Sequence, residues 1–135
     1  MTNKINEVTK KINKLNSLKE YNVDDFVRFD GDVDILTRQL KNDDIKTTQL
    51  RKFFAAVKEI NLETKTKTWN ELKVNFFLLM PKLAYAKGRK LISEDFYNLL
   101  ESAMNKVQSK EDFNRFVEFL EAIVAFYKAN KPRSL

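Results

Sequence analysis

The chain has 135 residues, 43% of them hydrophobic, and carries a net charge of +6 with neither cysteine nor histidine. Its length fits one domain with a buried core, and the lack of Cys and His excludes disulfides, thiolate metal sites and the common nucleophile–base pairs. We therefore expect no enzyme and no cofactor, although magnesium held by converging carboxylates stays open. The positive charge favours nucleic acid or an acidic surface as the partner, unless it serves solubility alone.

The sequence also lacks signals for secretion and membrane insertion. Its start, Met1–Lys14, is polar and basic without an apolar run, so no signal peptide is expected. No apolar segment reaches about eighteen residues, so we expect no membrane span and no membrane partner. The absence of cysteine fits a reducing compartment, and we predict a cytoplasmic protein with no small-molecule substrate.

Residues that interrupt helices are rare, with only two glycines and two prolines. This composition favours long helices over a β fold rich in turns, and eleven phenylalanines can fill a core. We predict an all-α fold, a single compact bundle of about five to six helices covering residues 1–135. Residues 44–130 would form its core and residues 1–43 an N-terminal helical region.

The N-terminal segment carries apolar residues three to four positions apart, at Ile5, Val8, Ile12, Leu15 and Leu18. This stripe is narrow and contains no aromatic residue, while lysines dominate the other faces. We expect a helix that docks on another surface, such as a neighbouring protein, or frays when alone.

The next segment, Asn22–Asp34, is acidic and predicts a turn, followed by a short helix over Val33–Leu40. Three aspartates alternate in the first of these segments, as at the start of a calcium-binding loop. Ile35 and Lys41 stand where such a loop needs glycine and glutamate. A solvated turn is therefore the better interpretation.

A longer helix is predicted to be capped by Thr47 or Thr48, whose hydroxyl groups can accept from the free amides of a first turn. Its apolar face comprises Leu50, Phe53, Phe54, Val57 and Ile60. At about 100° per residue, Arg51 and Lys58 share one edge of this face, and Lys52 lies opposite them.

After a linker near Glu63–Lys67, a helical period of apolar residues runs from Trp69 to Leu83. Pro81 interrupts this period. Proline removes an amide donor and clashes with the preceding turn, so a kink or a restart is expected there. Gly88 is predicted to end the helix by adopting the left-handed conformation.

Ser93 and Ser109 are predicted to cap the last two helices. The second of these fits the helical template without a miss, and Phe119 and Phe126 would widen its apolar face enough to contact a second helix. Pro132 is predicted to follow its end.

The segment Pro81–Lys90 contains four cationic side chains and no acid. Like charges this close repel one another, so an anion should relieve them. Lysines bind phosphates as point charges and give affinity without reading a sequence. Tyr85 lies within this segment and is a candidate for stacking on a base, whereas the helical spacing of Trp69 and Phe76 favours the core.

Three stretches of the chain, Ile45–Phe53, Pro81–Arg89 and Phe116–Tyr127, together resemble a known family. In this order and at this spacing they resemble the small helical subunit of type III-A CRISPR effector (Csm) complexes. The resemblance covers roughly Ile45–Lys128, and Met1–Asp43 lies outside it.

The resemblance implies a non-catalytic bundle, several copies of which stack along a ribonucleoprotein. The implied partners are the guide RNA, the single-stranded target RNA, other subunits of the complex and copies of the same chain. Arg51 and Lys52 match a basic pair of the family, and Lys87 and Arg89 flank a matching glycine. The other predicted contacts come from helical position and from the basic segment. The predicted RNA-binding residues are Arg51, Lys52, Lys58, Lys82, Lys87, Arg89 and Lys90.

A different class of function stays open. A helical interaction module that binds an acidic protein would use the same basic segment and the same broad apolar faces. An enzyme is the least favoured class, because the chain has no histidine.

Overall fold

The apolar periodicity of the chain becomes eight α-helices and a 3₁₀ turn in a computed structural model that describes residues 3–131. The helices are α1 (Lys4–Asn13), α2 (Val23–Val27), α3 (Asp32–Gln39), α4 (Thr47–Leu62), α5 (Trp69–Phe77), α6 (Leu79–Gly88), α7 (Glu94–Asn105) and α8 (Lys110–Asn130), with η1 (Leu18–Glu20) after α1. Within the described range no strand occurs, so the predicted all-α class is confirmed. Residues 1–2 and 132–135, with the predicted stop at Pro132, lie outside the described part of the chain.

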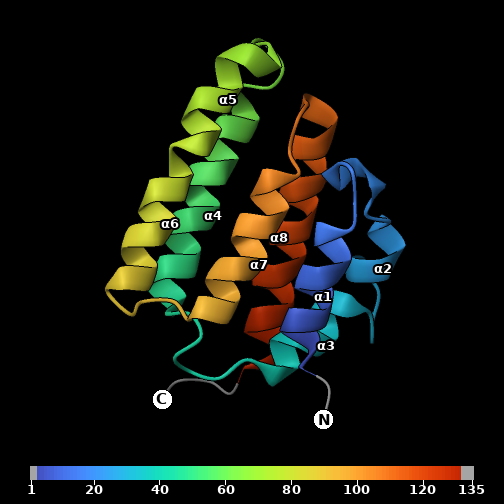
Figure 1. Cartoon of the computed structure of the whole chain (residues 1–135), viewed down its shortest axis with the longest axis vertical. Coiled ribbons are helices and arrows are strands. Elements are labelled where there is room, and N and C mark those ends of the chain that lie inside the picture. Colours follow the sequence, from blue (N-terminus) through green and yellow to red (C-terminus); the bar gives the residue numbers. More distant parts are fainter. Residues whose placement is uncertain (1–2, 132–135) are drawn as a thin grey trace.

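The helices form two groups on either side of α7 and α8 (Figure 1). On one side α1, α2 and α3 pack against α7 and α8. On the other side α4 packs on α8 and α6 packs on α7, while α5 and α6 follow each other alongside α4. No helix among the described residues is long and apolar enough to cross a membrane.

The centre of the core is the apolar face of α8. Phe113, Phe116 and Phe119 are 0% exposed, and Phe119 contacts the rings of Tyr21 and Phe26 at centroid distances of 5.6 and 5.4 Å. Phe119 thus widens the face of α8 toward a second group of helices, as its position predicted. Each fully buried aromatic side chain of this kind stabilises the fold by about 1.5–3 kcal/mol.

The N-terminal stripe is covered within the chain itself. Ile5, Val8 and Ile12 are buried where α1 packs against α7 and α3. The helix therefore docks on another surface, as predicted, but that surface belongs to α7 and α3 of the same chain and not to a neighbouring protein. The sequence of the segment does not reveal that α7 and α3 supply its partner surface.

The acidic segment is a solvated turn only in part: Asp30 lies in an exposed turn, whereas Asp32 and Asp34 are buried. Asn22 caps the short helix α2, and Asp32 begins α3 with only 8% of its surface exposed. The Asp32 carboxylate accepts from the Tyr21 hydroxyl at 2.6 Å and pairs with Lys11 at 2.9 Å and Lys4 at 3.2 Å. These partners lie on α1 and before α2, so the aspartate joins three segments instead of facing water.

The predicted threonine cap of α4 is also wrong. Thr47 is already helical, and Lys46 stands at the N-cap without a side-chain hydrogen bond. The cause is a contact with a distant segment. Ile45 forms an isolated antiparallel bridge with Ile92, and this pairing holds the backbone extended up to Lys46.

The restart predicted at Pro81 is confirmed. The chain leaves α5 at Phe77 and begins α6 at Leu79, so Pro81 lies in the first turn of the new helix. The first amides of a helix have no intrahelical partner, and a missing N–H therefore costs nothing there.

The end of α6 differs from the prediction at Gly88. Gly88 is the last helical residue and has no positive φ, whereas Lys90 has a φ of 61°. The Leu91 amide donates to the Ala86 carbonyl at 2.9 Å, and the Lys90 amide donates to Lys87 at 3.0 Å. These two bonds form a Schellman motif in which a lysine occupies the position that usually holds glycine.

We therefore expect Gly88→Ala and Lys90→Gly each to raise the free energy of unfolding by about 0.5–1 kcal/mol. An added Cβ at Gly88 would meet nothing within 4 Å, and alanine favours a helix. Glycine at position 90 removes the strain of the left-handed conformation. Urea unfolding followed by circular dichroism measures both changes, and a loss of stability in Lys90→Gly would contradict this description of the motif.

Ser93 and Ser109 cap α7 and α8 as predicted, since each hydroxyl accepts a hydrogen bond from a backbone amide in the first turn of the helix. Asp112 does not complete a capping box. Its carboxylate, 1% exposed, instead accepts from the amides of Lys19 at 2.7 Å and Gln108 at 2.9 Å. It thereby attaches the N-terminal segment to the start of α8.

Candidate nucleic-acid interface

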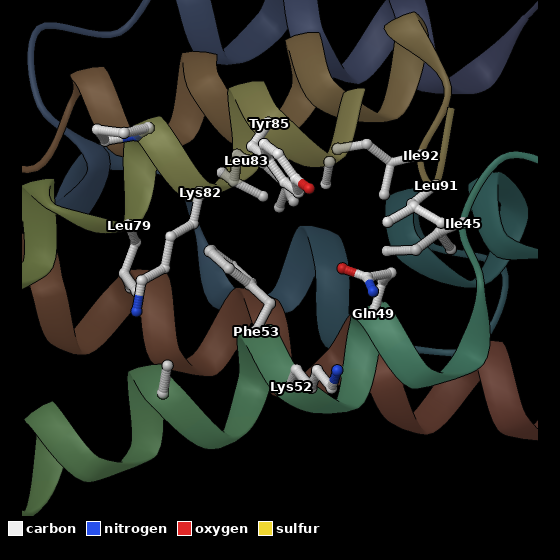
Figure 2. Close-up of a pocket in the computed structure, with 14 residues that line it drawn as sticks. Ile45, Gln49, Lys52, Phe53, Leu79, Lys82, Leu83, Tyr85, Leu91 and Ile92 are labelled. Carbon is white, nitrogen blue, oxygen red and sulfur yellow. The ribbon is translucent and has the colours of Figure 1, made fainter. Parts of the chain in front are cut away.

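A groove of about 520 Å³ lies between α4 and α6 (Figure 2). Most of the side chains that line it are apolar. Gln49 and Phe53 extend into it from α4, and Leu83 and Tyr85 extend toward them from α6. Leu100 of α7 also lines it.

Helical spacing explains why these side chains meet. The residues of α4 that line the groove are Gln49, Lys52, Phe53 and Ala56. Those of α6 are Leu79, Pro81, Lys82, Leu83, Tyr85 and Ala86. Apart from Pro81 and Tyr85, both sets follow the spacing i, i+3, i+4, i+7, which places them on one side of each helix. Because α4 packs on α8 and α6 packs on α7, neither helix fills the space between them.

Two lysines stand on opposite sides of this groove. Lys52 belongs to α4 and Lys82 to α6, and both side chains are exposed (Figure 2). Neither forms an ion pair with another residue in the range 3–131. The structure thus brings together two predicted residues that are thirty positions apart in the sequence.

Tyr85 is 65% exposed and belongs to the groove, whereas the other candidates for base stacking belong to the core. The Arg89 guanidinium lies 5.8 Å from the centroid of the Tyr85 ring. Phe76 is 0% exposed, and Trp69 packs against it at 6.0 Å. The core interpretation of Trp69 and Phe76 is therefore confirmed.

Lys87 and Lys90 line a separate hollow beside the end of α6, together with Asp43 and Glu94. The Lys87 ammonium lies 4.2 Å from the centroid of the Tyr97 ring, a distance typical of a cation–π contact. The two acidic residues make this hollow less positive than the sequence of α6 alone suggests.

Arg51 and Lys58 lie on the edge of α4 away from the groove. Both are exposed, and the Lys58 ammonium lies 5.3 Å from the Phe54 ring centroid. The seven predicted residues therefore form three groups: the lysines of the groove, the cations at the end of α6, and the outer edge of α4. None of them makes an ion pair with another described residue.

Other cations of the protein are engaged in the fold. Lys4 and Lys11 pair with Asp32, and Arg38 pairs with Asp30 at 2.7 Å and with Asp34. Burial opposes the charge of Lys11, but its carboxylate partners outweigh this and raise its pKa. These groups stabilise the N-terminal helices and are not available to an external anion.

Sequence reasoning missed the groove itself and the contribution of Gln49. The signal is present in the chain, since Gln49 and Lys52 share a helical side with Phe53. The groove could not be inferred, because it depends on the distance between α4 and α6.

Comparisons with known proteins give the same family twice. A family model described as Csm2 Type III-A matches residues 24–133. A curated protein of Streptococcus thermophilus, named CRISPR system Cms protein Csm2, is 24% identical over 86 residues, which is 62% of this chain and 71% of that protein. No solved structure matches. The family match begins within α2 and therefore includes α3. The resemblance seen in the sequence began only at Ile45 and did not reach α3.

Proposed function

The chain belongs to the Csm2 family of type III-A systems, and from this membership we propose that it binds guide and target RNA through their backbones. Membership of the family makes it a small subunit of a type III-A CRISPR complex. In our proposal the subunit is non-catalytic, and RNA cleavage belongs to other subunits. Base pairing with the guide reads the sequence, while this protein reads charge and shape, as in other RNA-guided complexes.

The observation that carries the proposal is the pair of unpaired lysines across the groove. Lys52 and Lys82 are exposed and have no acidic partner among the described residues. Phosphate is an anion that satisfies an ammonium group without demanding one geometry. We assign the phosphate contacts to these two lysines first, and to Arg51, Lys87 and Arg89 next.

We also propose contacts with other subunits and with copies of the same chain. Large apolar side chains are exposed where α4 ends and along α5, with Leu62 at 80%, Val74 at 59% and Leu78 at 56%. Apolar surface of this kind supports a contact with another protein.

The proposal is tested with the double variant Lys52→Gln/Lys82→Gln of the full chain. If each lysine holds one phosphate of single-stranded RNA, the plot of log affinity against log salt concentration will become less steep by about 1.4. At 0.1 M salt this change corresponds to a loss of roughly 20-fold in affinity. Unrelated RNA sequences should lose affinity equally. Fluorescence anisotropy with labelled RNA over a salt series measures both effects.

A matched control separates local contacts from net charge. Lys10→Gln/Lys14→Gln removes the same charge from exposed positions at the end of α1, which packs against α7 and α3. We expect this control to keep most of the affinity and the slope of the parent. Equal losses in both variants, or RNA binding by the groove variant that matches the parent in the reconstituted complex, would overturn the assignment.

A second candidate function is binding of an acidic protein, and the apolar lining of the groove favours it. An amphipathic acidic helix would place apolar side chains in the groove and carboxylates near the two lysines. Purification of the chain with one acidic protein and no RNA would select this alternative.

A further inference from the structure

The groove between α4 and α6 has a property that backbone binding does not use. Phosphates bind well to exposed cations on an open surface, whereas this groove is a concavity of about 520 Å³ lined mainly by apolar side chains. Its volume falls in the range of sites for small organic ligands, of about 300–1,000 Å³, and such sites also combine apolar walls with a few polar groups. Here those groups are Gln49, Lys52 and Lys82.

The exposed Tyr85 ring points to the kind of ligand. Tyr85 extends from α6 at the groove and keeps 65% of its surface exposed (Figure 2). The nearby Arg89 guanidinium, 5.8 Å from the ring centroid, adds a flat cation to the same region. Aromatic rings and guanidinium planes are the surfaces on which unstacked RNA bases pack.

We propose that this groove receives one unstacked base of single-stranded RNA, packed against Tyr85 and the apolar walls, while Lys52 and Lys82 hold phosphates of the same strand. The proposal rests on the RNA-binding function proposed above and names the part of the RNA that this site takes. A nucleotide has both a flat apolar ring and an anionic phosphate. It therefore matches an apolar groove between two unpaired lysines.

The only uncharged polar side chain among the described residues that line the groove, apart from the Tyr85 hydroxyl, is Gln49. Its amide both donates and accepts hydrogen bonds, so it can pair with the edge of any base. Stacking is likewise tolerant of base identity, because every base has a π face. The site thus selects for an unpaired base without selecting its sequence, since a base in a duplex is held in its stack.

The test compares two RNA probes on the full chain. One is a labelled single-stranded RNA of mixed sequence, and the other has the same length and phosphates but abasic riboses throughout. We expect the abasic RNA to bind about tenfold more weakly, because base–aromatic stacking is lost. Both RNAs should show the same salt slope, since their phosphates are unchanged.

Variants at Tyr85 locate the effect. Tyr85→Ala should weaken binding of the normal RNA about tenfold and show little further loss on the abasic RNA. Tyr85→Phe keeps the ring and should bind like the parent. The matched control is Phe29→Ala, which removes an aromatic ring that is 87% exposed on the other side of the molecule, between α2 and α3. It should leave the difference between the two probes unchanged.

The outcomes separate this inference from the proposed function. Equal affinity for normal and abasic RNA, with the salt dependence intact, would overturn the base site and leave backbone binding in place. If the parent chain shows no salt-dependent binding to either RNA, both the base site and the proposed backbone binding are wrong. If an acidic amphipathic peptide binds the parent chain but not Tyr85→Ala, and the bases make no difference, the groove belongs to a protein partner and the inference is wrong.

Discussion

Replacing Phe119 by alanine will lower the free energy of unfolding by about 3–5 kcal/mol. The side chain is 0% exposed, and its ring packs against Tyr21 and Phe26 from the N-terminal part of the chain. Its removal leaves a cavity at the contact that joins α8 to those segments. The expected loss is a large fraction of the total stability of a small domain, about 5–15 kcal/mol. Urea unfolding monitored by circular dichroism measures it.

Phe126→Ala serves as the control for this effect. Phe126 also lies on α8, but it is only partly buried and contacts the exposed Phe29 ring at 6.3 Å. Because the Phe126 side chain buries less apolar area than that of Phe119, we expect the free energy of unfolding to fall by only about 1 kcal/mol. Equal losses in the two variants would contradict the central place of Phe119 in the core.

The variant Asp32→Asn will lower the free energy of unfolding by about 2–3 kcal/mol at neutral pH. The carboxylate accepts from the Tyr21 hydroxyl and forms ion pairs with Lys11 and Lys4. A neutral amide at position 32 cannot form these ion pairs. The same variant should flatten the decline of stability in acid. Urea unfolding at a series of pH values from 7 to about 3 tests both statements.

The sign of the pH dependence follows from the surroundings of Asp32. Burial raises the pKa of this carboxyl, but the hydrogen bond from Tyr21 and the bonds from Lys11 and Lys4 outweigh burial and lower it. The folded protein therefore keeps Asp32 ionised at pH values where the unfolded chain, with a pKa of about 4, takes up a proton. The stabilisation is present above that value and is lost as the pH falls through the folded pKa. The control is Asp24→Asn, at an exposed position, which should leave the decline of stability in acid as it is in the parent.

The elements of this fold that depend on local periodicity were predictable from the sequence. The apolar face of α8, the serine caps of α7 and α8, and the restart near Pro81 follow from side chains within a few positions of one another. A residue's own helix determines these features, so no knowledge of the tertiary fold is needed.

The features that the sequence did not reveal depend on distant partners. The start of α4 is set by the pairing of Ile45 with Ile92, and Asp32 is buried because Tyr21 and Lys11 reach it. For the candidate site, the cations of α4 and α6 were predicted, but their grouping was not. Lys52 and Lys82 face the same groove only because their helices lie side by side.

The bridge between Ile45 and Ile92 has a topological consequence. Together with the hydrogen bonds from Lys46 to Leu91 and from Ser93 to Asp44, it joins the two ends of the segment that contains α4, α5 and α6. That segment therefore begins and ends at one place, while α4 packs on α8 and α6 packs on α7. Additional residues in its far turn, near Glu63–Lys67, would change the reach of the loop without moving its anchor, and long loops cost little extra closure entropy. The far turn can therefore lengthen without separating the start of α4 from the end of α6, and these two ends carry most of the cations that we assign to RNA.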